Sequence, residues 1–493
     1  MVKPWLALAS VMALGLAVRL YGLTAYGVWF DEAYHIQLVQ LPDIPTMLDA
    51  VLSNPPSDPL YVLLLRGWTT IFGYGDLSVR MLSVILGTFT IPATCWLGCV
   101  MANRSVGLVG ALLLAVSPYA IEFSQEAAMY ALASLTTTLA IAAGWRWRKS
   151  GSGLTLYVIL ATIAIYSHYV VAIILVLFML LGLYKNIPGA ISMRSWLAAN
   201  SAVFLLWSPW LIALVTYWIA SPQPRASLPH PATMEDVRAA LVQFTGGTAA
   251  LQQGQAQLQM LALFSGTALL LVGLLVSWKT RSFGFLIIVT VSTLFFLLPA
   301  VVSAMTGWWL FVPHFMLFLL PALLAVLACG ITWQPAGTSF PVKPGNFLPL
   351  LLIPMIAVQI WGLGLFYRHP PHGADGLREL ASVLKSEARA NEPVFVTPPV
   401  LTPTLRQYYS GRIHGLPVDF DLKSVYLPYE ASRWYEQSVA ALDADSANLD
   451  RFWLVYRPET DEGLKLLDYM TSHYDVVSRH KYIYADLYLL ESP

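Results

Sequence analysis

Two adjacent carboxylates, Asp31 and Glu32, follow the first apolar run of the sequence, in the stretch VWFDEAYHIQ. A carboxylate can serve as a general base, and two of them side by side at a membrane surface are costly to desolvate unless they are paired or used. Taken alone, Asp31 fits two interpretations: it caps a helix formed by AYHIQLVQL, or it belongs to a reactive site. The choice depends on the elements around it.

Later segments add further side chains that could move protons or bind anions, and each also has a structural interpretation. Glu126 suits a helix start, where the helix dipole favours a carboxylate. Tyr130 suits a membrane interface, and Arg80 suits an interfacial arginine that extends its charged end toward water. A histidine such as His168 at a helix end is often hydrogen-bonded for structural reasons alone.

The composition predicts a helical membrane protein with many spans. The chain has 493 residues, of which 57% are hydrophobic and 11% charged, and its mean hydropathy is +0.62. Apolar runs near the spanning length of about 20 residues recur along its first three quarters. The expected spans are 5–23, 78–101, 106–120, 127–145, 154–167, 169–184, 196–219, 259–278, 282–303, 310–328 and 347–366.

The positions of the basic residues set the expected sidedness. Placing the N-terminus in the cytoplasm puts these basic residues in the inner loops: Lys3, Arg104, Arg146, Arg148, Lys149, Lys185, Arg194, Lys279, Arg281 and Lys343. This is the positive-inside pattern, and it puts all 28 acidic residues on the outer side. We therefore expect a protein of the plasma membrane, which in a bacterium is the inner membrane. Its reactive site and its C-terminus are expected outside the cytoplasm.

Two domains are expected. Residues 1–369 form the transmembrane domain, with outer loops 24–77, which contains interfacial helices, and 220–258. Residues 370–493 form a small soluble α/β domain, with strands in PVFVTP, RFWLVYR and YADLYLL and amphipathic helices in GLRELASVLKSEARA and DEGLKLLDYMTSHY. The basic excess is scattered among short loops, which argues against a nucleic-acid partner.

The order and spacing of several motifs resemble one membrane enzyme family. FDEAYH, PLYVLLLRGWTTIFGYGDLSVRMLS, SPYAIEFSQEAAMYALASL, SHY and VPHF follow one another over about residues 1–330. Together they resemble the family 39-type membrane glycosyltransferases of the GT-C superfamily, which include protein O-mannosyltransferases and lipid A aminoarabinose transferases. The resemblance implies a GT-C fold with about 11 transmembrane helices. It also implies transfer of a sugar from a polyprenyl-phosphate donor to a protein, lipid A or envelope glycan acceptor.

The resemblance also implies roles for individual residues. Asp31 matches the catalytic aspartate that would act as base, with Glu32 orienting the site. Glu126 occupies the second acidic position, and Tyr130 and His168 fall on retained positions. A divalent metal ion bridging Asp31 and Glu126 is compatible with carboxylate ligands and stays open as an alternative.

The chain departs from the family pattern where a phosphate would be bound. Ala128 and His314 stand where relatives usually have arginines, and a guanidinium is well suited to phosphate. NPPSDP replaces the usual HPPLYY and adds Asp58, for which we also consider a place in substrate binding. The cations that could replace the arginines are Arg80, Arg225, Arg238 and a protonated His314.

Two other classes of function stay open. One is a transporter or flippase of lipid-linked sugars, which would place ionisable residues near the middle of the membrane. The acidic residues cluster at the outer side instead, which favours the transferase. The other is a degenerate family member that acts as a scaffold, for which the two missing arginines are the argument.

Overall fold

The computed structural model consists of two compact units, each of which is described by itself. The first contains residues 1–23, 56–216 and 227–371, and the second contains residues 24–55, 217–226 and 372–493. The structure describes residues 3–53, 59–182, 191–220, 232–252, several positions within 260–271, 283–306, 312–332, 348–369, 376–423, 434–446, 449–457, 461–482 and 485–493.

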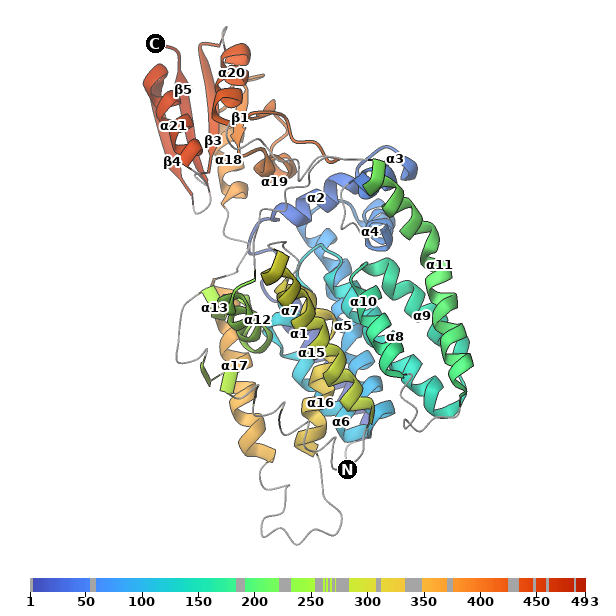
Figure 1. Cartoon of the computed structure of the whole chain (residues 1–493). Coiled ribbons are helices and arrows are strands. Elements are labelled where there is room, and N and C mark those ends of the chain that lie inside the picture. The colour runs from blue at the N-terminus through green and yellow to red at the C-terminus, as the bar shows by residue number, and fades with distance from the viewer. Residues whose placement is uncertain are drawn as a thin grey trace. The chain divides into compact units, whose positions relative to one another are not determined.

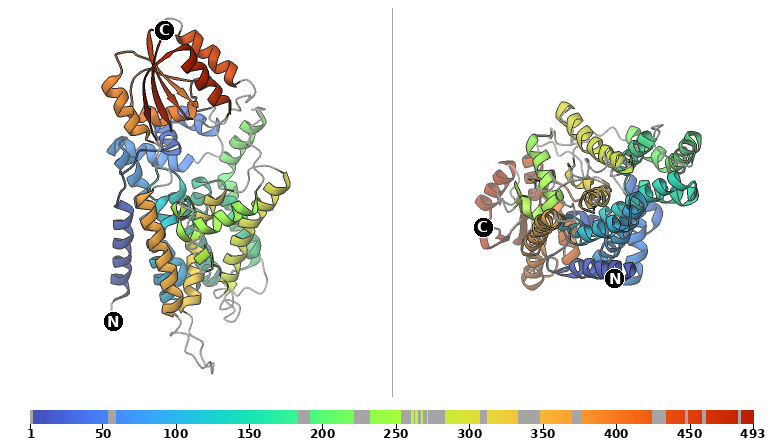
Figure 2. Two further views of the ribbon diagram at one scale, coloured as in Figure 1. Left: turned by 90° about the vertical axis from the view of Figure 1, so that its left-hand side faces the viewer. Right: turned by 90° about the horizontal axis from the view of Figure 1, so that it is seen from below.

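The first unit is helical (Figures 1 and 2). Its longer helices are α1 (Pro4–Leu20), α4 (Pro59–Phe72), α5 (Asp76–Met101), α6 (Arg104–Ala115), α8 (Tyr130–Ser150), α9 (Leu154–Ser167), α10 (Val171–Gly182), α11 (Met193–Ala220), α12 (Met234–Gly246), α15 (Phe283–Thr306), α16 (Leu320–Thr332) and α17 (Leu348–Arg368). Short elements are α7 (Pro118–Glu122), α13 (Thr248–Gln252) and the 3₁₀ helix η1 (Pro313–Phe318).

Helix α5 lies at the centre of this unit, against α1, α6 and α8. Its contact with α6 depends on a close approach of the two backbones. A Cβ atom on Gly107 would lie 2.4 Å from the carbonyl oxygen of Cys95, so only glycine fits there. Small residues that let helices approach closely are typical of membrane helix packing.

Three described helical segments are long and apolar enough to cross a membrane: Asp76–Met101, Met193–Tyr217 and Leu286–Thr306. Shorter apolar helices stand at most of the other expected spans, including α1, α6, α9 and α16. The expected span 310–328 is instead a 3₁₀ helix followed by α16, and 259–278 lies largely outside the described residues. The count of eleven spans therefore stays a prediction, whereas the mostly helical architecture is observed.

The second unit contains a five-stranded sheet with strand order β2-β1-β3-β5-β4. Its strands are β1 (Val394–Thr397), β2 (Ile413–Gly415), β3 (Arg451–Tyr456), β4 (Asp475–Lys481) and β5 (Asp486–Glu491). β1 pairs in parallel with β2 and β3, while β5 runs antiparallel to both β3 and β4. The three strands expected from the sequence are β1, β3 and β5.

Helices cover both faces of this sheet (Figure 2, left). One face packs against α18 (Leu377–Glu387) and α19 (Thr402–Tyr408), and the other packs against α20 (Trp434–Ser446) and α21 (Asp461–His473). The period-2 pattern explains this, because Val394 and Val396 face one layer while Phe395 faces the other. The small α/β domain expected in the tail is therefore present.

The second unit also includes two helices from the loop that follows α1. These are α2 (Phe30–Val39) and α3 (Ile44–Ser53), and α2 packs against α19. The loop 24–77 was expected to belong to the membrane domain, whereas in the structure its residues 24–55 cluster with the C-terminal residues. The segment with Asp31 and Glu32 is therefore supported by the C-terminal α/β domain.

Candidate functional site

The helix that holds the two adjacent carboxylates begins earlier than Asp31. Trp29 is the N-cap residue of α2, and the helix starts at Phe30. Asp31 and Glu32 therefore occupy the second and third helical positions, in the first turn. The interpretation of Asp31 as the N-cap is wrong, because Trp29 holds that position. The open backbone donor at the helix start is satisfied by a residue that lies within the helix.

That residue is Glu32. Its side chain is fully buried, and its Oε2 accepts a hydrogen bond from the backbone N–H of Trp29 at 3.1 Å. A glutamate at the third helical position reaches back in this way to satisfy a donor that the helix leaves open. Glu32 thus holds the start of α2, which is a structural task.

Asp31 differs from its neighbour. It is half-buried, and within the described part of the chain its carboxylate has no hydrogen-bond or ion-pair partner. Burial, with a smaller contribution from the nearby Glu32, raises the pKa of Asp31 to about 7. A carboxylate with a pKa near neutrality is suited to accept a proton from a substrate.

His35 supports the same turn of α2. Its Nδ1 lies 2.6 Å from the carbonyl oxygen of Asp31, so Nδ1–H is the donor. Burial lowers the pKa of His35 to about 4, although the contacts with Asp31 and Glu32 oppose this shift. The neutral ring therefore orders the backbone at Asp31 without adding charge.

The acidic residues of the SQEA segment lie in the first unit, between α7 and α8. Glu122 ends α7 and is buried, and its Oε2 accepts a hydrogen bond from the N–H of Thr248 at the start of α13, at 3.2 Å. Burial raises the pKa of Glu122 to about 7, while the bonds from Thr248 oppose the shift. Glu126 follows in a non-helical bend and is 3% exposed.

Gln125, between these two acids, connects the bend to α1. Its Nε2 donates to the carbonyl oxygens of Arg19 at 2.8 Å and Tyr21 at 2.9 Å. Open carbonyls at a helix end need such donors. Gln125 was not among the residues expected in the site, and the only signal in the sequence is an amide flanked by small residues and an acid.

Tyr130, His314 and His168 belong to one group of packed rings. The hydroxyl of Tyr130 lies 3.4 Å from Nε2 of His314, and the two rings meet edge to face at 5.2 Å. Phe315 contacts both histidine rings, at 5.0 Å for His314 and 4.8 Å for His168. Three of the expected site residues are thus brought close together in the first unit.

His168 is fully buried at the C-terminal end of α9. Its Nδ1 accepts a hydrogen bond from the N–H of Val170 at 3.2 Å, which orders the turn into α10. Burial, with a smaller contribution from His314, lowers the pKa of His168 to about 3. The imidazole is therefore neutral and ordered by the backbone.

Arg80 is fully buried near the start of α5, and its Nη1 donates to the carbonyl oxygen of Leu23 at 2.8 Å. The interpretation of Arg80 as an exposed interfacial side chain is therefore wrong. Ala128 is fully buried as well, and its carbonyl oxygen accepts a 3.4 Å hydrogen bond from the hydroxyl of Ser83. An arginine does not fit at position 128 without displacing packed neighbours.

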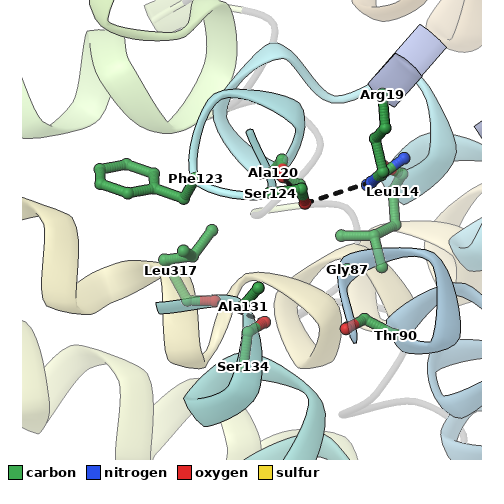
Figure 3. A pocket seen from close by; sticks show the side chains of 10 residues that line it. All are labelled: Arg19, Gly87, Thr90, Leu114, Ala120, Phe123, Ser124, Ala131, Ser134 and Leu317. Carbon is green, nitrogen blue, oxygen red and sulfur yellow. Dashed lines mark hydrogen bonds between the residues drawn. The ribbon is translucent and has the colours of Figure 1, made fainter. Parts of the chain in front are cut away.

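Arg19 is fully buried in the first unit, beside the small cavity drawn in Figure 3. It donates to the carbonyl oxygens of Gly15, Leu114 and Ala115 at 3.0, 3.4 and 3.2 Å, and to the Ser124 hydroxyl at 3.2 Å. Leu114 and Ala115 end α6, so the cation binds carbonyls at the negative end of that helix. Arg19 lines a cavity of about 10 Å³, which is room for one water molecule.

The expected site residues thus divide between the two units. Asp31 and Glu32 lie in the second unit, and Glu126, Arg80, Tyr130, His168 and His314 lie in the first. Asp58 and Arg225 lie outside the described residues. Arg238 forms a surface ion pair with Glu235.

The residues described in the structure contain no group of three His, Cys, Asp or Glu side chains that could hold a metal ion. Asp31 and Glu126 belong to different units, so the idea of a metal ion bridging them stays a prediction.

In sequence, the chain matches no known family model and no curated protein. In structure, it is similar to ArnT from Cupriavidus metallidurans in the apo state, with a TM-score of 0.61 and 11% identity over 98% of this chain and 97% of that one. ArnT bound to undecaprenyl phosphate gives a TM-score of 0.59 at 11% identity, over 99% and 98%.

A second similar structure is the archaeal oligosaccharyltransferase AglB from Archaeoglobus fulgidus, in complex with an inhibitory peptide and a dolichol-phosphate. Its TM-score is 0.54 at 11% identity, over 92% of this chain and 69% of that chain. ArnT and AglB are both GT-C membrane glycosyltransferases. The chain therefore has the fold of the GT-C superfamily, as the order of its motifs indicated.

Proposed function

We propose that the protein is an inverting glycosyltransferase. It takes a sugar from a polyprenyl-phosphate-linked donor and passes it to a protein, lipid A or envelope glycan at the outer face of the bacterial inner membrane. One observation supports this above the others: in a GT-C fold, the half-buried Asp31 carboxylate follows α1 and has no partner among the described residues.

Asp31 acts as the base in this proposal. The acceptor hydroxyl loses its proton to the Asp31 carboxylate as its oxygen attacks the anomeric carbon of the sugar. The bond between that carbon and the phosphate oxygen breaks with its electron pair, which releases polyprenyl phosphate and inverts the configuration. A pKa of about 7 lets Asp31 accept this proton near neutral pH and release it afterwards.

The leaving phosphate needs positive charge or hydrogen-bond donors more than it needs a proton. Arg80 is the first candidate, because the bond from Nη1 to Leu23 fixes its guanidinium. Tyr130 and His314 form the second, since the hydroxyl and the imidazole lie 3.4 Å apart and both can donate to an anion. Glu126 orients the acceptor.

The proposal is tested first by ligand binding. Purified protein is heated with a panel of polyprenyl-phosphate sugars and with bare polyprenyl phosphate, and the unfolding temperature is recorded. A ligand that binds only the folded state stabilises it by about 2.7 kcal/mol at 100 times its dissociation constant. We expect a shift that depends on the sugar, which also ranks the sugars as donors.

The second test follows the bond itself. With the best donor and extracts of candidate acceptors, transfer is measured by release of polyprenyl phosphate. Shifts without any release, together with movement of the intact lipid-linked sugar across liposomes, would instead support the transporter. A folded sample that responds to none of the lipids would support the scaffold.

A further inference from the structure

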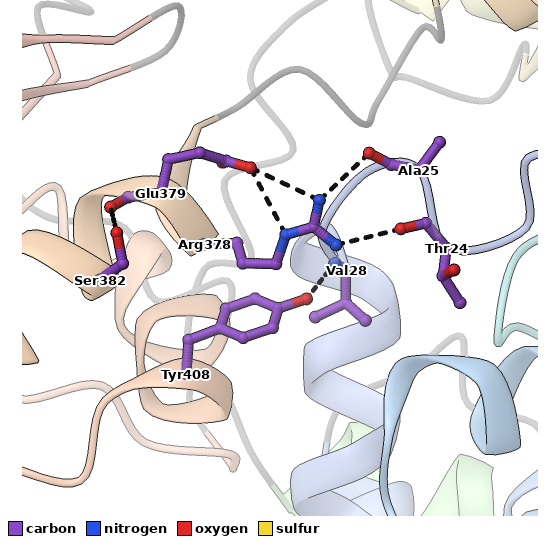
Figure 4. A network of polar contacts seen from close by, with 7 residues as sticks. All are labelled: Thr24, Ala25, Val28, Arg378, Glu379, Ser382 and Tyr408. Carbon is purple, nitrogen blue, oxygen red and sulfur yellow. Dashed lines mark hydrogen bonds and ion pairs between the residues drawn. The ribbon is translucent and has the colours of Figure 1, made fainter.

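The segment that leads into α2 is fastened to the C-terminal α/β domain by its backbone (Figure 4). Arg378 of α18 donates from Nη1 to the carbonyl oxygen of Thr24 and from Nη2 to that of Ala25, both at 3.1 Å. The N–H of Val28 donates to the hydroxyl of Tyr408, at the end of α19, at 2.6 Å. These three bonds join residues more than 350 positions apart.

The contact is also close enough to restrict the residue between these bonds. A Cβ atom on Gly27 would lie 3.2 Å from the Tyr408 hydroxyl oxygen and 3.3 Å from Cβ of Arg378. Gly27 thus lets the chain pass directly over the two side chains. The segment from Thr24 to Trp29 forms no helix or strand of its own, so its path depends on such contacts.

Helix α2 itself adds two more contacts to the same domain. Gln37 donates from Nε2 to the carbonyl oxygen of Pro403 at 3.2 Å, and the ring of Phe30 meets that of Phe420 edge to face at 6.0 Å. Both the approach to the helix and the helix are therefore held from the C-terminal side of the sequence.

We propose that the C-terminal α/β domain is a positioning device for Asp31, in which Arg378 and Tyr408 hold the backbone of residues 24–28 and so fix where α2 begins. This rests on the proposed function, because it takes Asp31 as the base. Arg378 and Tyr408 are positioning residues: they bind main-chain atoms three to seven residues before Asp31 and act on the reaction through that backbone.

The mechanism needs such support because general-base catalysis depends on geometry. A displacement of about 1 Å at a reacting group can cost on the order of 100-fold in rate. Glu32 fixes the first turn of α2 relative to Trp29, but it cannot fix the helix in space. The bonds from Arg378 and Tyr408 supply that fixed point, because they connect the segment to helices that pack on a five-stranded sheet.

The test compares Tyr408→Phe, Arg378→Ala and Arg378→Lys with Arg479→Ala in the full-length protein. Tyr408→Phe removes one oxygen atom and keeps the ring, so it leaves the fold least disturbed. Arg479 lies on β4 and pairs with Asp486 in the same sheet, so its loss controls for removal of an arginine from this domain. Arg378→Lys keeps a cation that can donate to both carbonyls.

Two readouts are taken. Hydrogen exchange of the amides in residues 24–36 should become about tenfold faster in Tyr408→Phe and Arg378→Ala. In these variants the segment can open locally without first breaking the bonds to Arg378 or Tyr408. With donor and acceptor, kcat should fall about 10- to 100-fold while the donor KM stays near wild type. Arg378→Lys should recover part of both effects, and Arg479→Ala should show neither.

Unchanged exchange in Tyr408→Phe and Arg378→Ala would overturn the proposal whatever the activity, and so would faster exchange with wild-type kcat. Failure of the proposed function is distinguishable from this: the wild-type protein would then release no polyprenyl phosphate, or Asp31→Asn would keep full activity, while the exchange of residues 24–36 would still respond to Tyr408→Phe.

Discussion

The start of α2 and the bend after α7 both use an acidic side chain to satisfy a backbone N–H, but their second acids differ in exposure. Each contains two acidic residues, and in each one acid accepts a hydrogen bond from a backbone N–H at a helix start. Glu32 does this for Trp29 and Glu122 does it for Thr248. The second acid is Asp31 in the first pair and Glu126 in the other.

The two remaining acids differ in access. Asp31 is half-buried and has no bonding partner in the described chain, whereas Glu126 is 3% exposed. A base must reach a substrate hydroxyl and exchange its proton afterwards, which requires access. The comparison therefore favours Asp31 as the base and gives Glu126 an orienting role. Four experiments test this assignment.

The largest effect is expected for Asp31→Asn. Asparagine has the same shape but cannot accept the proton, so turnover should fall on the order of 1,000-fold, within the range for loss of a general base. Polyprenyl-phosphate release gives the rate, and the unfolding temperature checks the fold. Turnover within tenfold of wild type in a well-folded sample would remove Asp31 as the base.

The second effect concerns pH. Because burial raises the pKa of Asp31 to about 7, its basic form is present above pH 7 and is lost as the pH falls. With one such group, kcat should drop about 100-fold between pH 8 and pH 5. Glu122 also has a pKa of about 7, so Glu122→Gln is the control and should keep the same acid limb. If the acid limb disappears in Glu122→Gln, the titration belongs to Glu122 and not to Asp31.

Glu126→Gln should have a smaller effect. If Glu126 orients the acceptor, turnover should fall on the order of tenfold, and the acid limb near pH 7 should stay in place. The pH profile of the variant measures both. A loss as large as that of Asp31→Asn would mean that Asp31 and Glu126 are equally required for the same step.

The smallest effect on turnover is expected for Glu32→Ala. Loss of the bond to the Trp29 N–H should destabilise the start of α2 by about 1 kcal/mol, the usual cost of a lost helix cap. We expect a lower unfolding temperature and a turnover reduced only a few-fold. Glu32→Gln should be milder, since the amide oxygen can still accept the bond.

The sequence predicted those parts of the molecule that depend on local pattern or on ordered motifs. Alternating hydrophobic residues predicted β1, β3 and β5, and the motif order predicted the GT-C fold. It did not predict β2, which has only three residues, or β4, whose DVVSRHK lacks a clear alternation. The grouping of Tyr130, His168 and His314 also needed the structure, because nothing local connects residue 130 with residue 314.

The errors in the site have a common physical cause. Asp31 was expected to be a candidate N-cap because Asp is good at that position, but a buried Glu at the third helical position does the capping instead. One of the two interpretations of Arg80 placed its charged end near water, yet the guanidinium donates to a carbonyl 57 residues away. The contacts of Gln125 and Arg378 also join distant segments. The residues next to a side chain in the sequence do not reveal a partner that lies so far along the chain.

The bonds of Arg19 have a consequence for how the protein is made. The carbonyls of Leu114 and Ala115 that receive its guanidinium lie 95 and 96 residues further along the chain. As the chain emerges from the ribosome, α1 holds a cation in an apolar helix before α6 exists. The first helix therefore completes its packing only after the helix hairpin of α5 and α6 has been inserted beside it.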